Sequence, residues 1–67
     1  MYNIKYSTHC GYENEITVIE EQFALFYFKS LIKAVDAHEV VMIDGFTGEV
    51  IMMWTDGNFS VLNGVIL

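Results

Sequence analysis

The sequence predicts an α+β fold, a two-layer sandwich in which one antiparallel sheet carries a single helix on one face. Two stretches, residues 2–18 and 40–62, show the alternating or continuous apolar patterns of strands. Between them, residues 20–37 carry apolar side chains at helical spacing. The expected order along the chain is therefore strand, strand, helix, strand, strand, strand. With 67 residues and no linker-like tract, residues 1–67 are expected to form one domain.

The first two strands are predicted from alternation over residues 2–18. Tyr2, Ile4 and Tyr6 alternate with polar side chains, and the apolar residues of segment 12–18 do the same. The sequence Thr-His-Cys-Gly at residues 8–11 lies between these segments and is expected to form the turn. We therefore expect an N-terminal hairpin with its acidic residues on the solvent side.

The helix is predicted over residues 20–37. Thr17 and Glu20 match the spacing of an N-terminal capping box, and acidic residues suit the positive end of the helix dipole. One stripe of side chains is expected to pack on the sheet: Ala24, Leu25, Phe28, Leu31, Ile32 and Val35. Three aromatic residues fall outside that stripe, on a side that would normally be solvated: Phe23, Phe26 and Tyr27.

Two turns between residues 40 and 62 set the pairing of the last three strands. The Asp-Gly pair at residues 56–57 is the strongest hairpin signal in the chain. As a two-residue loop it pairs Thr55 with Asn58, Trp54 with Phe59, Met52 with Val61 and Ile51 with Leu62. The turn at residues 45–48 places Ile43 opposite Val50 and Val41 opposite Met52.

These pairings divide the apolar residues between two faces of the sheet. The face expected beneath the helix holds Val41, Ile43, Val50, Met52, Trp54, Phe59 and Val61. The outward face is expected to hold Val40, Met42, Ile51, Met53 and Leu62. Because one helix covers only one face of a sheet, the second apolar face needs another partner.

We therefore expect a small acidic protein–protein interaction module, without enzymatic activity, that acts as a scaffold or regulator. The first candidate partner is a second copy of the chain in a homodimer, because obligate interfaces are rich in apolar side chains. The candidate interface comprises Val40, Met42, Ile51, Met53, Leu62, Phe23, Phe26 and Tyr27. Two alternatives remain open: the C-terminal tail or the N-terminal hairpin covers the outward face, or a different protein does.

The charge balance excludes one class of partner and suggests another. Nine acidic residues stand against three lysines and no arginine, giving a net charge of −6. Direct binding of nucleic acid requires clustered cations and is not expected. An acidic protein is better suited to a basic protein surface. The candidate acidic face comprises Glu13, Glu15, Glu20, Glu21 and Glu39.

An alternative function follows from that charge: an acidic inhibitor that blocks the nucleic-acid-binding groove of a host protein. In size and charge alone, the chain resembles small accessory proteins of bacteriophages and mobile elements, such as anti-CRISPR proteins and uracil-DNA glycosylase inhibitors. It carries no motif specific to any one of these families. The analogy implies only that the five acidic residues should form one contiguous face.

The sequence contains no catalytic, cofactor or metal signature. His9 and Cys10 are adjacent, but a nucleophile pair needs its side chains to meet and a third group to orient the base. Zinc needs about four ligands, and only the tertiary fold could bring His9, Cys10 and His38 to a carboxylate. Asp44 and Glu49 are expected to face each other across a turn, where they serve turn geometry and solubility. We thus expect no enzyme, no cofactor and no metal site.

The chain is expected to reside in the cytoplasm and to make no contact with a membrane. It starts without the basic and apolar segments of a signal peptide. Its longest uncharged stretch, residues 57–67, is too short and too polar to span a bilayer. The single cysteine, Cys10, rules out an internal disulfide and is expected to be reduced.

Overall fold

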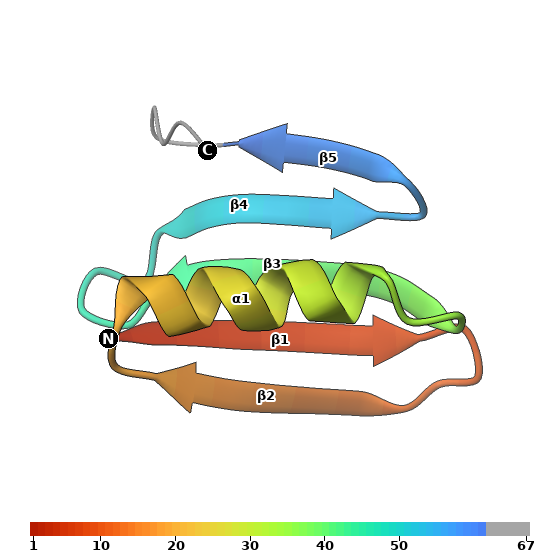
Figure 1. The fold of residues 1–67 in the computed structure, drawn as a ribbon, viewed down its shortest axis with the longest axis horizontal. Helices are drawn as coiled ribbons and strands as arrows, with labels where there is room; N and C mark the ends of the chain where they lie inside the picture. Colours follow the sequence, from red (N-terminus) through yellow and green to blue (C-terminus); the bar gives the residue numbers. More distant parts are fainter. Residues whose placement is uncertain (62–67) are drawn as a thin grey trace.

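The computed structural model describes residues 1–61 and confirms the predicted α+β two-layer architecture. Five strands form one antiparallel sheet, and a single helix packs on one face (Figure 1). The elements are β1 (Tyr2–Thr8), β2 (Glu13–Val18), α1 (Glu21–Ile32), β3 (Ala37–Asp44), β4 (Val50–Thr55) and β5 (Asn58–Val61). Their order in the sequence is the one that the sequence patterns predict.

The strands lie in the order β2-β1-β3-β4-β5. The predicted N-terminal hairpin is present, with Ile4 paired to Ile16 and Lys5 to Glu15. Strand β1 also pairs with β3, so α1 returns the chain across β1 and lies over β1 and β3 (Figure 1). The β1–β2 turn, the start of β3 and the β4–β5 turn therefore meet at one end of the sheet (Figure 1).

Helix α1 is shorter than predicted at its C-terminal end. It stops at Ile32, and the N–H groups of Lys33 and Ala34 bond to carbonyls three residues back in a tightened last turn. Val35, expected in the packed stripe, is fully exposed. The helix ends early because the chain must already be extended at Ala37 to pair with β1.

The predicted capping box does not form at the start of α1. Glu20 is the N-cap residue, in an extended conformation, and no side chain caps the helix. Thr17 instead lies in β2, where its hydroxyl donates a hydrogen bond to Asn3 Oδ1 at 3.1 Å. Thr17 therefore pairs in the sheet instead of capping the helix, because the contact between β2 and β1 outweighs the local capping preference.

The hydrophobic core lies between α1 and the three adjacent strands β1, β3 and β4. Its fully buried side chains are Ile4, Ala24, Phe28, Val40, Met42 and Met52. Half-buried residues surround this cluster, among them Leu25, Leu31, Ile32 and Trp54. Of the predicted helix stripe, Ala24, Leu25, Phe28, Leu31 and Ile32 thus pack as expected.

The pairing of β4 with β5 confirms the predicted hairpin. Thr55 pairs with Asn58, Trp54 with Phe59 and Met52 with Val61. Asp56 and Gly57 both have positive φ, +46° and +91°, as a two-residue hairpin loop requires. The predicted pair of Ile51 with Leu62 lies outside the described residues.

The pairing of β3 with β4 corrects the predicted faces of the sheet. Ile43 pairs with Val50 as expected, but Met52 pairs with Met42 rather than with Val41. A bulge lies between these pairs and inserts Ile51 as an extra residue in β4. Because a shift of one residue moves a strand's side chains to the other face, the predicted inner and outer residues of β3 exchange places.

Val40 and Met42 were expected to point outward, and this expectation is wrong. Both are buried beneath α1, at 0% and 1% exposure. Val41 and Ile43, expected beneath the helix, instead pair with Lys5 and Asn3 on the other face of the sheet, which we call the open face.

The open face is mixed rather than continuously apolar. Register and alternation place on it the polar residues Asn3, Lys5, Ser7, Glu13, Glu15, Thr17, Glu39 and Thr55. Its apolar strip consists of Val41, Ile43, Met53 and Val50, which was expected beneath the helix; all four are partly exposed. The second large apolar face predicted from the sequence is therefore reduced to a narrow strip between polar side chains.

Candidate functional site

The outward side of α1 exposes three aromatic residues. Phe23 is 52% exposed, Phe26 is 64% exposed and Tyr27 is 43% exposed. With Gln22 they line a shallow groove, and the rings of Phe26 and Tyr27 meet edge to face at 6.0 Å. We call this side of the helix the aromatic face, and at helical spacing it also includes Ser30 and Lys33. Such a cluster of large apolar side chains is typical of a contact surface.

The charges along α1 are segregated by position. Glu20 and Glu21 lie at its start, whereas Lys29 and Lys33 lie at its end. Two of the chain's three lysines therefore lie at the C-terminal end of the aromatic face, and two glutamates lie at its N-terminal end.

A second cluster of polar side chains lies at the end of the sheet where three chain segments meet. His9 comes from the β1–β2 turn, His38 from the start of β3 and Asp56 from the β4–β5 turn. His9 Nε2 lies 2.8 Å from Asp56 Oδ1, and His38 Nδ1 lies 3.0 Å from Asp56 Oδ2. The centroids of the two imidazole rings are 4.7 Å apart. One carboxylate thus contacts both imidazoles.

Backbone hydrogen bonds hold this cluster in place. The His9 N–H donates to the Asp36 carbonyl at 3.1 Å, which ties the β1–β2 turn to the start of β3. The Asp56 N–H donates to the His38 carbonyl at 3.0 Å, which ties the β4–β5 turn to the same strand. All three side chains are therefore presented from segments that are fixed to one another.

The electrostatics of the cluster favour an ionised Asp56. The short polar contact with His38 is the largest cause, and together with the charges of His38 and His9 it lowers the pKa of the Asp56 carboxyl. Desolvation acts in the opposite direction but is outweighed. The Nδ1 atom of His38 is itself buried and makes no hydrogen bond among the described residues, so its contact with Asp56 is poorly aligned.

Cys10 is exposed and does not join the histidine cluster. Its sulfur lies 3.1 Å from the hydroxyl oxygen of Thr8, whereas the neighbouring His9 side chain turns to Asp56. The adjacent His9 and Cys10 of the sequence therefore point to different partners, and this arrangement does not resemble a nucleophile and its base.

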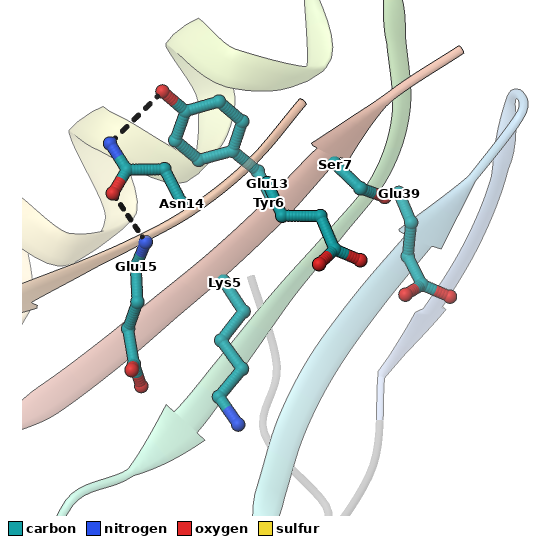
Figure 2. A pocket seen from close by; sticks show the side chains of 7 residues that line it. All are labelled: Lys5, Tyr6, Ser7, Glu13, Asn14, Glu15 and Glu39. Atoms are coloured by element: carbon teal, nitrogen blue, oxygen red, sulfur yellow. Dashed lines mark hydrogen bonds between the residues drawn. The ribbon is translucent and has the colours of Figure 1, made fainter. Parts of the chain in front are cut away.

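Acidic side chains gather on the open face near β2. Glu13, Glu15 and Glu39 line a shallow pocket of about 470 Å³ together with Lys5 and Ser7 (Figure 2). Glu20 and Glu21 lie instead at the start of α1, on the helix side of the sheet. The five residues of the predicted acidic face are thus divided into a group of three and a group of two.

Asp44 and Glu49 lie at the β3–β4 turn as predicted. The Asp44 N–H donates to the Glu49 carbonyl at 2.8 Å, so the two residues are opposite each other. Asp44 Oδ1 accepts hydrogen bonds from the N–H groups of Phe46 and Thr47 at 2.8 and 3.3 Å. This carboxylate therefore stabilises the turn.

The structure separates the residues of the predicted interface. Val40 and Met42 are core residues, and Ile51 is half-buried against the core on the helix side. Met53 is on the open face. Leu62 lies outside the described residues. The three aromatic residues of α1 in the predicted interface are exposed, as an interface requires: Phe23, Phe26 and Tyr27.

Comparisons of the chain with protein-family models, curated proteins and solved structures found no match. Within residues 1–61, the structure has no helix that combines the length and the apolar character needed to cross a membrane.

Proposed function

We propose that this protein is a self-associating interaction module that dimerises through the aromatic face of α1. The observation that carries the proposal is the exposure of Phe23, Phe26 and Tyr27 side by side on one helix. Aromatic residues are enriched at the energetic centres of protein interfaces. A second copy of the chain offers the same apolar surface in return, and this surface contains no carboxylate that the contact would have to desolvate.

The area of the aromatic face suits the centre of a dimer interface. Fully buried aromatic side chains cover about 150–250 Å² each, and these three are roughly half exposed, so they offer about 300 Å² per copy. A stable interface buries about 800 Å² on each partner. The three rings would therefore supply the apolar centre, and the surrounding polar residues would supply the rim.

Charge complementarity favours an antiparallel pair of helices. A two-fold axis near Phe26 and Tyr27 would place Lys33 of each copy opposite Glu20 of the other. A parallel pair would instead bring the lysines together and the glutamates together. With its two-fold axis the antiparallel arrangement is isologous, so both copies use the same surface and the assembly closes as a dimer.

The open face of the sheet is a weaker candidate for the contact with a second copy. Its apolar strip of Val41, Ile43, Val50 and Met53 is narrow. The acidic group of Glu13, Glu15 and Glu39 lies beside it, and two copies meeting there would oppose like charges.

Light scattering coupled to size exclusion tests the proposal. The wild-type protein should elute with the mass of a dimer, and Phe26→Glu should elute as a monomer with an unchanged circular dichroism spectrum. Phe46→Glu is the matched control, because Phe46 is 81% exposed but lies in the β3–β4 turn. A wild-type monomer at all concentrations, or a dimer that survives Phe26→Glu, would refute the proposal.

The five acidic residues do not form the single contiguous face that was expected, but the smaller group of Glu13, Glu15 and Glu39 still favours a second candidate function, an acidic inhibitor that occupies a basic nucleic-acid-binding groove. The test is competition between this protein and DNA for purified nucleases and glycosylases at low and high salt. Binding that weakens with salt and with the triple change Glu13→Gln, Glu15→Gln, Glu39→Gln would support this function. If none of the tested nucleases and glycosylases loses DNA binding in the presence of this protein, the inhibitor function is contradicted.

A further inference from the structure

We propose that His9, His38 and Asp56 form a binding site for a divalent transition-metal ion of the Zn²⁺ class. The three residues are far apart in the sequence, but the sheet brings their side chains together at one end. Their potential ligand atoms, two imidazole nitrogens and a carboxylate oxygen, all lie within 4.8 Å of one another. This cluster is independent of the aromatic face and of the proposed dimer.

The spacing of these atoms is close to that of a metal site. Zinc binds histidine nitrogen and carboxylate oxygen at about 2.0–2.2 Å, so ligand atoms at the corners of a tetrahedron lie about 3.4 Å apart. The contacts of Asp56 with His9 and His38, at 2.8 and 3.0 Å, are slightly shorter than this. All three ligand atoms lie within 4.8 Å of one another, so the carboxylate and the rings would have to rotate to admit an ion between them.

The set of donor atoms indicates the class of metal. Imidazole nitrogen suits Zn²⁺ and its neighbours in the first transition row, whereas Ca²⁺ and Mg²⁺ prefer oxygen ligands alone. Three protein ligands leave at least one position for water, as in zinc sites that remain open to solvent. The side chains are 53% (His9), 43% (His38) and 45% (Asp56) exposed, so an ion can enter directly.

The Nδ1 atom of His38 adds to this geometry. This nitrogen is buried, and its contact with Asp56 Oδ2 at 3.0 Å is too poorly aligned to be a hydrogen bond. Buried polar atoms whose hydrogen bonds are not satisfied are uncommon in native proteins and call for an explanation, such as an ion. A cation held between the nitrogen lone pair and the carboxylate would satisfy both groups.

A metal ion at this position would clamp three segments of a small domain. It would join the β1–β2 turn, the start of β3 and the β4–β5 turn, which backbone hydrogen bonds already hold together. The chain has one cysteine and so no internal disulfide, which makes such a clamp a natural source of added stability. Binding to the folded state alone would raise the melting temperature, and the rise would grow with the logarithm of the free metal concentration above the dissociation constant.

Zinc titration of the untagged protein tests this proposal, because His9 and His38 are the chain's two histidines and their imidazole signals can be followed separately by NMR. Wild-type protein should bind one Zn²⁺ per chain by calorimetry, shift the signals of both imidazoles and melt at a higher temperature. Asp56→Asn and His38→Gln should weaken binding by more than about 100-fold, since even changes behind the ligands cost about 10–100-fold. Asparagine tolerates the left-handed conformation of Asp56, so the first variant preserves the turn.

Two controls make the result decisive. Cys10→Ser should bind Zn²⁺ as the wild type does, because the thiol lies outside the cluster, and Glu15→Gln should do the same. The proposal is overturned if the wild type fails to bind stoichiometrically below millimolar Zn²⁺, if only one imidazole responds, or if Asp56→Asn binds equally well. Loss of binding in Cys10→Ser would also overturn it, since the site would then be a thiolate site.

Discussion

Replacement of Phe28 by alanine should remove most of the stability of this domain. Phe28 is 1% exposed at the centre of the core, and its ring meets that of Phe59 edge to face at 6.0 Å. Truncation of a buried phenylalanine destabilises proteins by about 3–5 kcal/mol, and a lost aromatic pair accounts for about 0.5–1.5 kcal/mol of such an effect. At about 0.05–0.15 kcal/mol per residue, a chain of 67 residues has roughly 3–10 kcal/mol in total. Phe28→Ala should therefore be partly or wholly unfolded at 25 °C.

Urea denaturation followed by the fluorescence of the single tryptophan, Trp54, measures this effect. The matched control is Phe26→Ala, a change of the same residue type in the same helix at a position that is 64% exposed. At protein concentrations too low for dimers, the control should stay within about 0.5 kcal/mol of the wild type. Equal losses in the two variants, or a loss below about 1 kcal/mol for Phe28→Ala, would show that α1 does not pack as described.

The remaining predictions concern the sheet and the dimer. Val40→Glu should unfold the protein, because an unpaired charge in the core costs several kcal/mol. Val41→Glu should remain folded by circular dichroism, and the reverse result would show that β3 has the register expected without the bulge. Glu20→Lys and Lys33→Glu should each weaken the dimer in sedimentation experiments, and the double variant should recover it; additive losses would reject the antiparallel arrangement. Met53→Glu, on the open face, should leave the dimer intact, and a monomer would move the contact to the sheet.

Much of the fold could be predicted because local signals in the sequence agree with it. The Asp-Gly pair at residues 56–57 fixes the register of β4 with β5, since few other residues accept positive φ at both loop positions. Helical spacing identified the buried Ala24 and Phe28 and the exposed Phe23 and Phe26. These features depend on residues close together in the chain, where periodicity carries the information.

The faces of β3 could not be predicted because of one extra residue. The bulge at Ile51 moves Met42 opposite Met52 and so exchanges the buried and open sides of β3. Val40, Val41, Met42 and Ile43 are all apolar, so the sequence offers no alternation to report the exchange. A strand that is apolar on every position leaves its register to the partner strands.

The histidine cluster could not be predicted for a different reason. His9 and His38 are distant in the sequence, and Asp56 is already explained by the hairpin loop that it forms with Gly57. Only the strand order, with β3 between β1 and β4, brings the three residues to one end of the sheet. As expected from the sequence, nothing short of the tertiary fold could bring the histidine ligands to a carboxylate. The metal proposal depends on the fold having done so.

The most direct test of the proposed self-association is a dilution series of amide NMR spectra of the wild-type protein. If the aromatic face of α1 is the contact between two copies, signals should move with concentration at Phe23, Phe26 and Tyr27, and the open face around Glu39 and Met53 should stay constant. Spectra that do not change from micromolar to millimolar concentration would contradict self-association. Changes confined to the open face would place the contact on the opposite side of the molecule.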